Sequence, residues 1–330
     1  MLTPVITDKP LLLTTVTDHL AHTYRYSPEE LTPFINWIYF FYAWQLPTRY
    51  ASVAALHLCD ACRRSWIGQF PTKEQAQARE ALHLYEDALS LLGVMGSSYY
   101  VQARLALQEA WSDGDDLVFF PAEHPNKAVR LPLLRQQHPA TEGAPNLCLA
   151  DFVRPKRLGV KDCVGVFATA VDPLMEQLEA HDDYRHLLAQ TLCDRLAEAA
   201  AEKLHAEVRT HLWGYAPDER LIPTEMFQCR YRGIRPAVGY PSLPDQSVNF
   251  ILDELIDFSA IRLSLTSSGA MLPHGSVSGL MLAHPQARYF ELGLIGEDQL
   301  TDYAQRRHLP ESELRKFLSG RIHTESSTTP

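Results

Sequence analysis

The segment Arg235-Pro-Ala-Val-Gly-Tyr-Pro-Ser-Leu-Pro-Asp245 contains three prolines, one glycine and one tyrosine within eleven residues. Each proline fixes its own φ angle and favours an extended conformation in the residue before it. The segment therefore cannot be a helix and is a poor central strand, so it predicts a rigid loop. Such a loop loses little conformational entropy when a ligand binds. The alternative is a simple connector between two elements.

The composition is typical of a soluble globular protein. The chain has 330 residues, of which 46% are hydrophobic and 21% are charged, and no change in composition marks a linker, so we expect a single domain. Asp and Glu number 40 against 30 for Lys and Arg, which gives a net charge of −10. This charge argues against a nucleic-acid partner and is compatible with a cationic small molecule.

No segment of the sequence has the length of a membrane span. The most apolar run, residues 34–44, is about half as long as a spanning helix and contains Asn36. The N-terminus lacks the pattern of a secretion signal. We therefore expect a cytoplasmic protein without a membrane partner.

Hydrophobic spacing predicts the main elements. Residues 182–213 form the clearest helix, because Leu188, Leu192 and Leu196 repeat every four residues. Ser27 suits the cap of a helix that begins at residue 28. The β-branched character of residues 115–121 and 161–171 predicts strands. Less regular patterns predict helices at 49–68, 73–92, 251–258 and 297–320, and strands at 281–284 and 289–295.

A row of carboxylates follows the 182–213 helix. Asp194, Glu198 and Glu202 share one face at a spacing of four residues. Such a row is usually the solvated side of a helix. Here alanines stand at 197 and 199–201, which indicates that other elements pack closely on nearly every side.

The cysteines give no metal prediction. Cys59 and Cys62 form the one Cys-x-x-Cys motif, with His57 two residues earlier. A zinc ribbon needs a second pair at similar spacing, which is missing. Residues 52–64 read as a helix, so we interpret the two cysteines as small buried side chains rather than as a metal or redox site.

Several common chemistries are missing from the sequence. It contains no glycine-rich dinucleotide fingerprint, no Walker-type loop and no Gly-x-Ser-x-Gly elbow. It also lacks the Asp-x-His-x-x-Gly signature with which corrinoid proteins place a histidine under cobalt. We therefore expect no catalytic acid–base cluster, and no cobalamin held by this chain itself.

Four segments occur in the order in which one protein family has them. They are 149–156 (Leu-Ala-Asp-Phe-Val-Arg-Pro-Lys), 181–215, 233–245 with its Arg-Pro-Ala-x-Gly-Tyr-Pro loop, and 275–289. Weaker similarities lie at 34–37, 134–137 and 302–307. By these motifs the chain resembles the activation domain of cobalamin-dependent methionine synthase, its S-adenosylmethionine-binding module. The resemblance extends from about residue 30 to about residue 320.

The resemblance implies a fold. It is a single C-shaped α+β domain, in which helices flank a central twisted antiparallel sheet and S-adenosylmethionine lies in a shallow groove. We place this domain at residues 27–322, after an N-terminal extension at 1–26. The polar tail at 323–330 is predicted to be disordered.

The family's ligand-binding positions fall on seven residues of this sequence: Asn36, Glu198, Arg235, Ala237, Gly239, Tyr240 and Tyr289. Arg235 suits the ligand's carboxylate and Glu198 its amine. The two tyrosines offer rings to adenine or to the sulfonium, worth roughly 0.5–2 kcal/mol by cation–π attraction. Backbone groups of Ala237 and Gly239 suit adenine or the amino-acid end. The alternatives are a surface salt bridge for Arg235 and strand packing for Tyr289.

Three positions depart from the family. Asn36 stands where the family has an aspartate, which predicts weaker binding of a cationic ligand. Leu243 and Gln246 stand where it has a cysteine and a histidine, so contacts to cobalamin are expected to differ.

The predicted function is reductive methylation, and thus reactivation, of cob(II)alamin on a separately encoded cobalamin-dependent methionine synthase. Met1 stands just ahead of the module, which favours separate encoding. Flavodoxin or a similar donor would supply the electron, S-adenosylmethionine the methyl group, and the partner the cobalamin. The alternative is a non-catalytic binding or regulatory partner of another corrinoid protein. An independent methyltransferase is less favoured, because it usually has a glycine-rich turn after its first strand.

Overall fold

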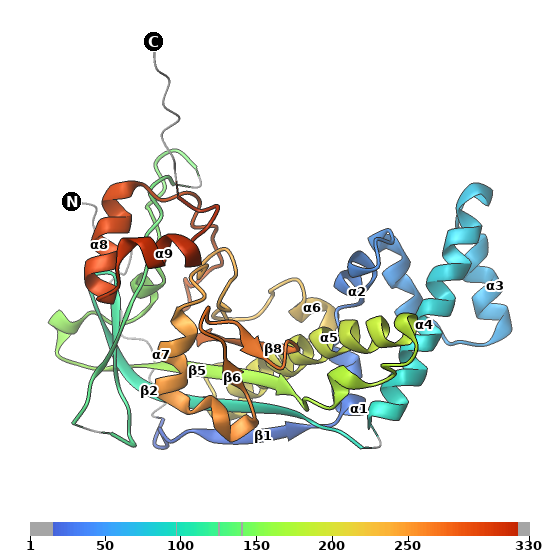
Figure 1. The fold of residues 1–330 in the computed structure, drawn as a ribbon, viewed down its shortest axis with the longest axis horizontal. Helices are drawn as coiled ribbons and strands as arrows, with labels where there is room; N and C mark the ends of the chain where they lie inside the picture. The colour runs from blue at the N-terminus through green and yellow to red at the C-terminus, as the bar shows by residue number, and fades with distance from the viewer. Residues whose placement is uncertain (1–15, 97, 125, 140, 323–330) are drawn as a thin grey trace, which may run out of the picture.

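The computed structural model describes residues 16–322 except 97, 125 and 140. The predicted tail at 323–330 and the first fifteen residues of the predicted extension lie outside this range. An antiparallel sheet runs along the molecule, with helices at both ends (Figure 1). The two helical ends rise on the same side of the sheet, which gives the predicted C-shaped outline. The fold is a single α+β domain, as the resemblance implied.

The sheet is built on two long central strands that pair along ten residues of each. The strand order is β4-β3-β2-β5-β8, in which β2 and β5 are the two long strands, and β1 also pairs with β2. The predicted strands at 115–121 and 161–171 are confirmed as β3 and β5. The six strands are β1 (His22–Tyr26), β2 (Val101–Asp113), β3 (Asp116–Phe120), β4 (Val129–Pro132), β5 (Asp162–Val171) and β8 (Ser276–Met281).

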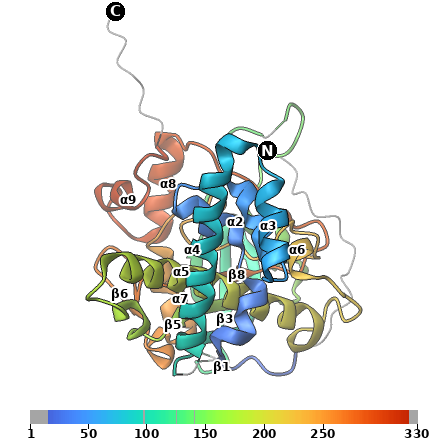
Figure 2. The same cartoon turned by 90° about the vertical axis from the view of Figure 1, so that its right-hand side faces the viewer.

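The helices cover the sheet and extend beyond it. A two-stranded ribbon, β6 (Ser264–Leu265) with β7 (Met271–Leu272), follows α7. In the side view of Figure 2, α4 and α3 stand at the front and α8 and α9 behind. The α-helices are α1 (Pro28–Leu31), α2 (Trp37–Ala43), α3 (Asp60–Gly68), α4 (Gln75–Gly96), α5 (Asp183–Glu207), α6 (Pro223–Met226), α7 (Val248–Ile256), α8 (Glu297–Arg307) and α9 (Glu311–Phe317).

Helix α5 is the predicted leucine-striped helix. The Asp182 side chain caps it by accepting from the Arg185 N–H at 3.0 Å, and Leu188, Leu192 and Leu196 are fully buried. Burial of each leucine stabilises the fold by about 1.5–3 kcal/mol. The helix lies close to the sheet, because Thr169 Oγ1 on β5 donates to the Ala197 carbonyl at 2.9 Å. The alanines at 197 and 199–201 are buried, as their pattern predicted.

Two predicted helices are interrupted. Residues 48–55 form a 3-10 helix, the chain then extends, and α3 begins at Asp60. The predicted helix at 49–68 is therefore wrong at its centre. The predicted helix at 297–320 is two helices, because His308 ends α8 with φ at 54° and Pro310 precedes α9.

The strand predicted at 289–295 is also wrong. The segment is extended, but the N–H of Leu292 donates to the Pro241 carbonyl and that of Ile295 to the Arg321 carbonyl. Its partners are loops rather than a neighbouring strand. Alternating apolar residues indicated extension correctly and could not show what the backbone would pair with.

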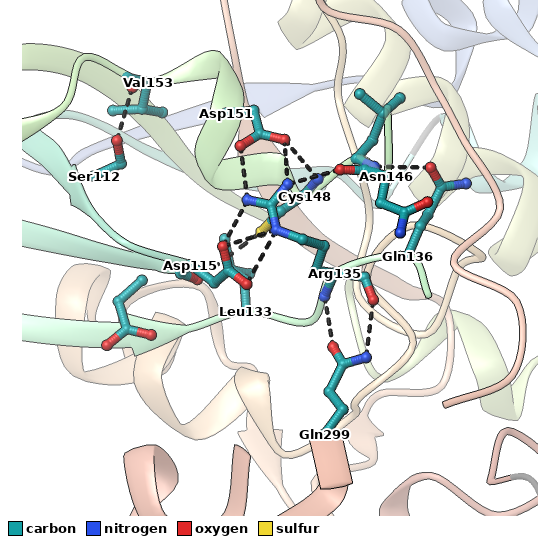
Figure 3. A network of polar contacts seen from close by, with 12 residues as sticks. Ser112, Asp115, Leu133, Arg135, Gln136, Asn146, Cys148, Asp151, Val153 and Gln299 are labelled. Carbon is teal, nitrogen blue, oxygen red and sulfur yellow. Dashed lines mark hydrogen bonds and ion pairs between the residues drawn. The ribbon is translucent and has the colours of Figure 1, made fainter. Parts of the chain in front are cut away.

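An arginine network fastens α8 to the sheet (Figure 3). The Arg135 guanidinium donates to Asp115 at 2.6 Å and to Asp151 at 2.7 Å. The Arg135 N–H donates to Gln299 Oε1 at 2.7 Å, and Gln299 Nε2 donates back to the Arg135 carbonyl at 2.9 Å. Helix α8 is thereby fixed to the segment after β4 and, through Asp115 and Asp151, to the β2–β3 turn and the 149–152 segment.

Candidate functional site

The proline-rich loop lies beside β8 rather than in solvent. The Ile234 N–H donates to the Leu282 carbonyl, the Leu280 N–H to the Pro236 carbonyl, and the Val238 N–H to Ser278, at 2.9–3.0 Å. A Cβ at Gly279 would lie 2.3 Å from the Pro236 carbonyl oxygen. Glycine is therefore required on β8, because only glycine lets the loop come so close.

A turn at Gly239 ends this paired stretch. Gly239 has φ at 87°, which an L side chain rarely adopts. Its N–H donates to the Leu243 carbonyl at 2.8 Å, and the Leu243 N–H donates to the Tyr240 carbonyl at 2.9 Å. The Ala237 carbonyl accepts from the Tyr240 N–H at 3.3 Å. The Ala237 carbonyl and the Gly239 N–H are therefore engaged in hydrogen bonds within the loop.

Tyr240 connects the loop to α5. Its hydroxyl donates to Glu198 Oε1 at 2.9 Å, while Arg195 donates to Glu198 Oε2 at 2.8 Å. Burial, together with the Glu198 charge, raises the pKa of Tyr240 to about 12. The phenol is thus protonated at neutral pH and remains a donor. Half of Tyr240 is exposed.

Arg235 forms a nearly buried ion pair one helical turn further along α5. Its Nη2 donates to Glu202 Oε2 at 3.1 Å, and the side chains are 14% and 9% exposed. Arg235 Nε and Glu202 Oε1 are buried without a hydrogen-bond partner in the described part of the chain. Unpaired polar atoms of a buried ion pair are costly. The pair therefore has hydrogen-bonding capacity that the protein alone does not use.

Tyr289 holds the start of the loop. Its hydroxyl accepts from the Arg235 N–H at 2.9 Å and lies 3.0 Å from the Tyr231 hydroxyl. Burial raises the pKa of Tyr289. The strand-packing alternative for this residue does not apply, because the segment is not a strand.

A buried layer beneath the ion pair was not predicted. His205, fully buried on α5, packs edge-on against Tyr231 with ring centroids 4.9 Å apart. Burial, reinforced by the charges of Arg209 and Arg235, holds the pKa of His205 well below its usual range. Glu202 belongs to the carboxylate row of α5, and His205 follows it by three residues on the same helix. The sequence alone did not indicate that the 235–245 loop packs over these two residues.

The carboxylate row passes from solvent to the interior along α5. Asp194 is exposed, Glu198 is half-buried and Glu202 is 7% exposed. The row is therefore not simply the solvated side of α5, and the expectation of close packing is confirmed. Glu202 was recognised in the row but not as a site residue.

Asn36 occupies a different place. It caps α2, and its Oδ1 accepts from the Ile38 N–H at 3.2 Å. No hydrogen bond within the described ranges joins Asn36 to the loop. The structure brings Glu198, Arg235, Tyr240 and Tyr289 into one cluster with Glu202, and leaves the role of Asn36 as a prediction.

The hollow between α5, the loop and β8 is small. Its volume is about 110 Å³, which is below the roughly 300–1,000 Å³ of enclosed ligand pockets. The hollow is therefore too small to enclose a ligand, and Arg235, Glu202 and Tyr289 do not line it. The hollow is lined by Asp194, Arg195, Glu198, Val238, Tyr240, Met271, Ser276 and Val277.

The loop, α5 and the 289–295 segment thus bring one arginine, two carboxylates and two tyrosines together in a domain of the α+β class. Residues 28–308 match the family described as vitamin B12 dependent methionine synthase, activation domain. The match covers most of the chain, and the chain belongs to this family.

A solved structure supports this assignment. The chain is similar to the one titled "Crystal Structure of the MetH Reactivation Domain bound to AdoHcy", with 32% sequence identity and a TM-score of 0.80. The similarity covers 97% of this chain and 96% of that one. Separately, none of the helices that the structure describes is long and apolar enough to cross a membrane.

Proposed function

We propose that this chain binds S-adenosylmethionine between α5 and the 235–245 loop, and presents it to the cobalamin of a cobalamin-dependent methionine synthase. The reaction would be the reductive methylation that reactivates cob(II)alamin. The observation that carries the proposal is the half-satisfied Arg235–Glu202 ion pair, which lies one turn from Glu198. Membership of the activation-domain family and the AdoHcy-bound relative support it.

The chemistry of the cluster fits the ligand. Glu202 holds one side of the Arg235 guanidinium, whose unpartnered Nε leaves a donor for the ligand's carboxylate. Glu198 and the unpartnered Oε1 of Glu202 offer acceptors for its amine. Two carboxylates in a partly buried site also favour a sulfonium cation.

The aromatic and backbone groups complete the proposed site. Tyr240 and Tyr289 are 50% and 39% exposed, so their rings are accessible to adenine or to the sulfonium. Ala237 and Gly239 would contact the ligand through the backbone of the rigid loop. Asn36 would contribute without the charge of the family's aspartate, which weakens attraction to a cation.

Bound S-adenosylmethionine would supply an activated methyl group, and the chain's contribution would be positioning. Arg235 and Glu198 would fix the amino-acid end of the ligand. No proton transfer by the protein is required for this role. The cobalamin would come from the partner and the electron from flavodoxin or a similar donor.

Calorimetric titration with S-adenosylmethionine tests the binding step. We expect saturable binding to the wild type and at least about 10-fold weaker binding to Arg235→Ala, because a charge-assisted hydrogen bond is worth about 1.5–3 kcal/mol. Arg262→Ala is the matched control, since the Arg262 side chain is 69% exposed and pairs only with Asp172 among the described acidic residues. Equal affinity of the two variants would reject Arg235 as a ligand contact.

The reactivation step needs a separate assay. The protein would be mixed with a methionine synthase fragment loaded with cob(II)alamin, reduced flavodoxin and S-adenosylmethionine, and methylcobalamin followed by its absorption spectrum. Formation that depends on this chain supports reactivation. A stable complex without methyl transfer supports the regulatory alternative instead.

A further inference from the structure

A second cluster of donor side chains lies at the beginning of α3, in the helical end formed by α2–α4 (Figure 1). One ligand atom from each of His57, Cys59 and Cys62 lies within 4.8 Å of the other two. The cluster lies outside both the hollow beside α5 and the 235–245 loop.

The interpretation of these cysteines as buried side chains is wrong. Cys59 is exposed and Cys62 is only half-buried. The chain leaves its 3-10 helix at Ala55, and the Cys59 N–H donates to the His57 carbonyl at 2.8 Å. This tight turn brings the imidazole beside the sulfurs. Core packing therefore does not explain why the three residues stand together.

The two sulfurs lie at the first turn of the helix. Cys59 is the N-cap of α3, and its Sγ accepts from the Cys62 N–H at 3.4 Å. The two Sγ atoms are 3.1 Å apart. Two ligands on a tetrahedral zinc ion, at about 2.3 Å each, would be about 3.8 Å apart. A shift of less than about 1 Å at exposed side chains separates the observed geometry from that of a chelate.

The donor set selects a class of ligand. Thiolate and imidazole are the groups that zinc and other thiophilic ions prefer, whereas magnesium and calcium require oxygen. Two thiolates neutralise a divalent ion, and three protein ligands leave a fourth position open. A disulfide would use the two cysteines and leave the histidine without a role.

We propose that His57, Cys59 and Cys62 form a binding site for a thiophilic divalent metal ion, for which Zn²⁺ is the natural probe. The ion would tie the segment before α3 to the first turn of that helix. This site is independent of S-adenosylmethionine binding.

Titration of the reduced, chelator-treated protein with Co²⁺ tests the proposal. We expect thiolate-to-cobalt charge-transfer absorption that saturates at about one ion per chain and disappears when Zn²⁺ is added. Cys59→Ser and Cys62→Ser should each bind at least about 100-fold more weakly, and His57→Gln about 10- to 100-fold. Cys229→Ser is the control, because Cys229 is also exposed but lies outside the cluster.

Four results would overturn the proposal. One is a wild-type protein without the charge-transfer band, and another is an equal loss of the band in Cys229→Ser. The third is a Cys59–Cys62 disulfide found by mass spectrometry in a protein whose reduced form binds neither metal, which would identify a redox pair. An unchanged affinity in His57→Gln would remove the histidine from the site and reject the three-ligand assignment.

Discussion

Replacing one partner of the Arg235–Glu202 ion pair should destabilise the fold strongly, because both side chains are nearly buried. Each side chain is less than one sixth exposed, with 14% for Arg235 and 9% for Glu202. Replacing one partner leaves the other charge buried and uncompensated, which costs about 3–5 kcal/mol. We therefore expect Glu202→Gln, which keeps the side-chain volume, to lower the free energy of unfolding by about 3 kcal/mol.

A double-mutant cycle isolates the pair. Urea unfolding would be measured for the wild type, Glu202→Gln, Arg235→Gln and the double variant, and we expect the double variant to lose at least about 1 kcal/mol less than the sum of the single losses. Glu254→Gln is the matched control: Glu254 pairs with Lys127 at 2.6 Å, but the pair is 43% and 67% exposed, so its loss should cost less than about 1 kcal/mol. Additive losses, or a loss at Glu202 no larger than at Glu254, would refute the buried-pair argument.

Three further outcomes are expected. Gly279→Ala should lower the melting temperature and weaken S-adenosylmethionine binding, since its Cβ would lie 2.3 Å from the Pro236 carbonyl oxygen and displace the loop; normal binding by calorimetry would contradict this. Buried His205 resists protonation that the unfolded chain accepts, so the free energy of unfolding should fall by about 1.4 kcal/mol per pH unit as pH drops below about 6.5. In urea unfolding from pH 7.5 to pH 5.5, His205→Asn should lack this part of the pH dependence, and equal slopes would contradict it. Tyr240→Phe removes the hydroxyl that donates to Glu198 and should destabilise by only about 1 kcal/mol while keeping the ring; a melting curve like that of the wild type would show that the bond contributes nothing.

Local sequence features predicted the elements that carry the site. Proline and glycine restrict the 235–245 loop through their own dihedral angles, and the leucine repeat of α5 depends on neighbours three and four residues apart. Both are properties of short segments. The loop and α5 were therefore predictable before their contact was known.

The parts that sequence could not predict depend on contacts between distant segments. Glu202 is buried because the loop and Tyr231 lie over α5, although a carboxylate row usually faces water. Cys59 is exposed because the helical pattern at 49–68 breaks at a short extended segment. The cluster of His57, Cys59 and Cys62 follows from that break, which the helical interpretation did not include.

The most direct test of the central claim is a crystal structure of this chain with S-adenosylmethionine. The account predicts the ligand between α5 and the 235–245 loop, with its carboxylate within about 2.7–2.9 Å of the Arg235 guanidinium and its amine at Glu198 or Glu202. A ligand bound elsewhere would contradict the account. So would a ligand bound in this place without a contact to Arg235 or Glu202.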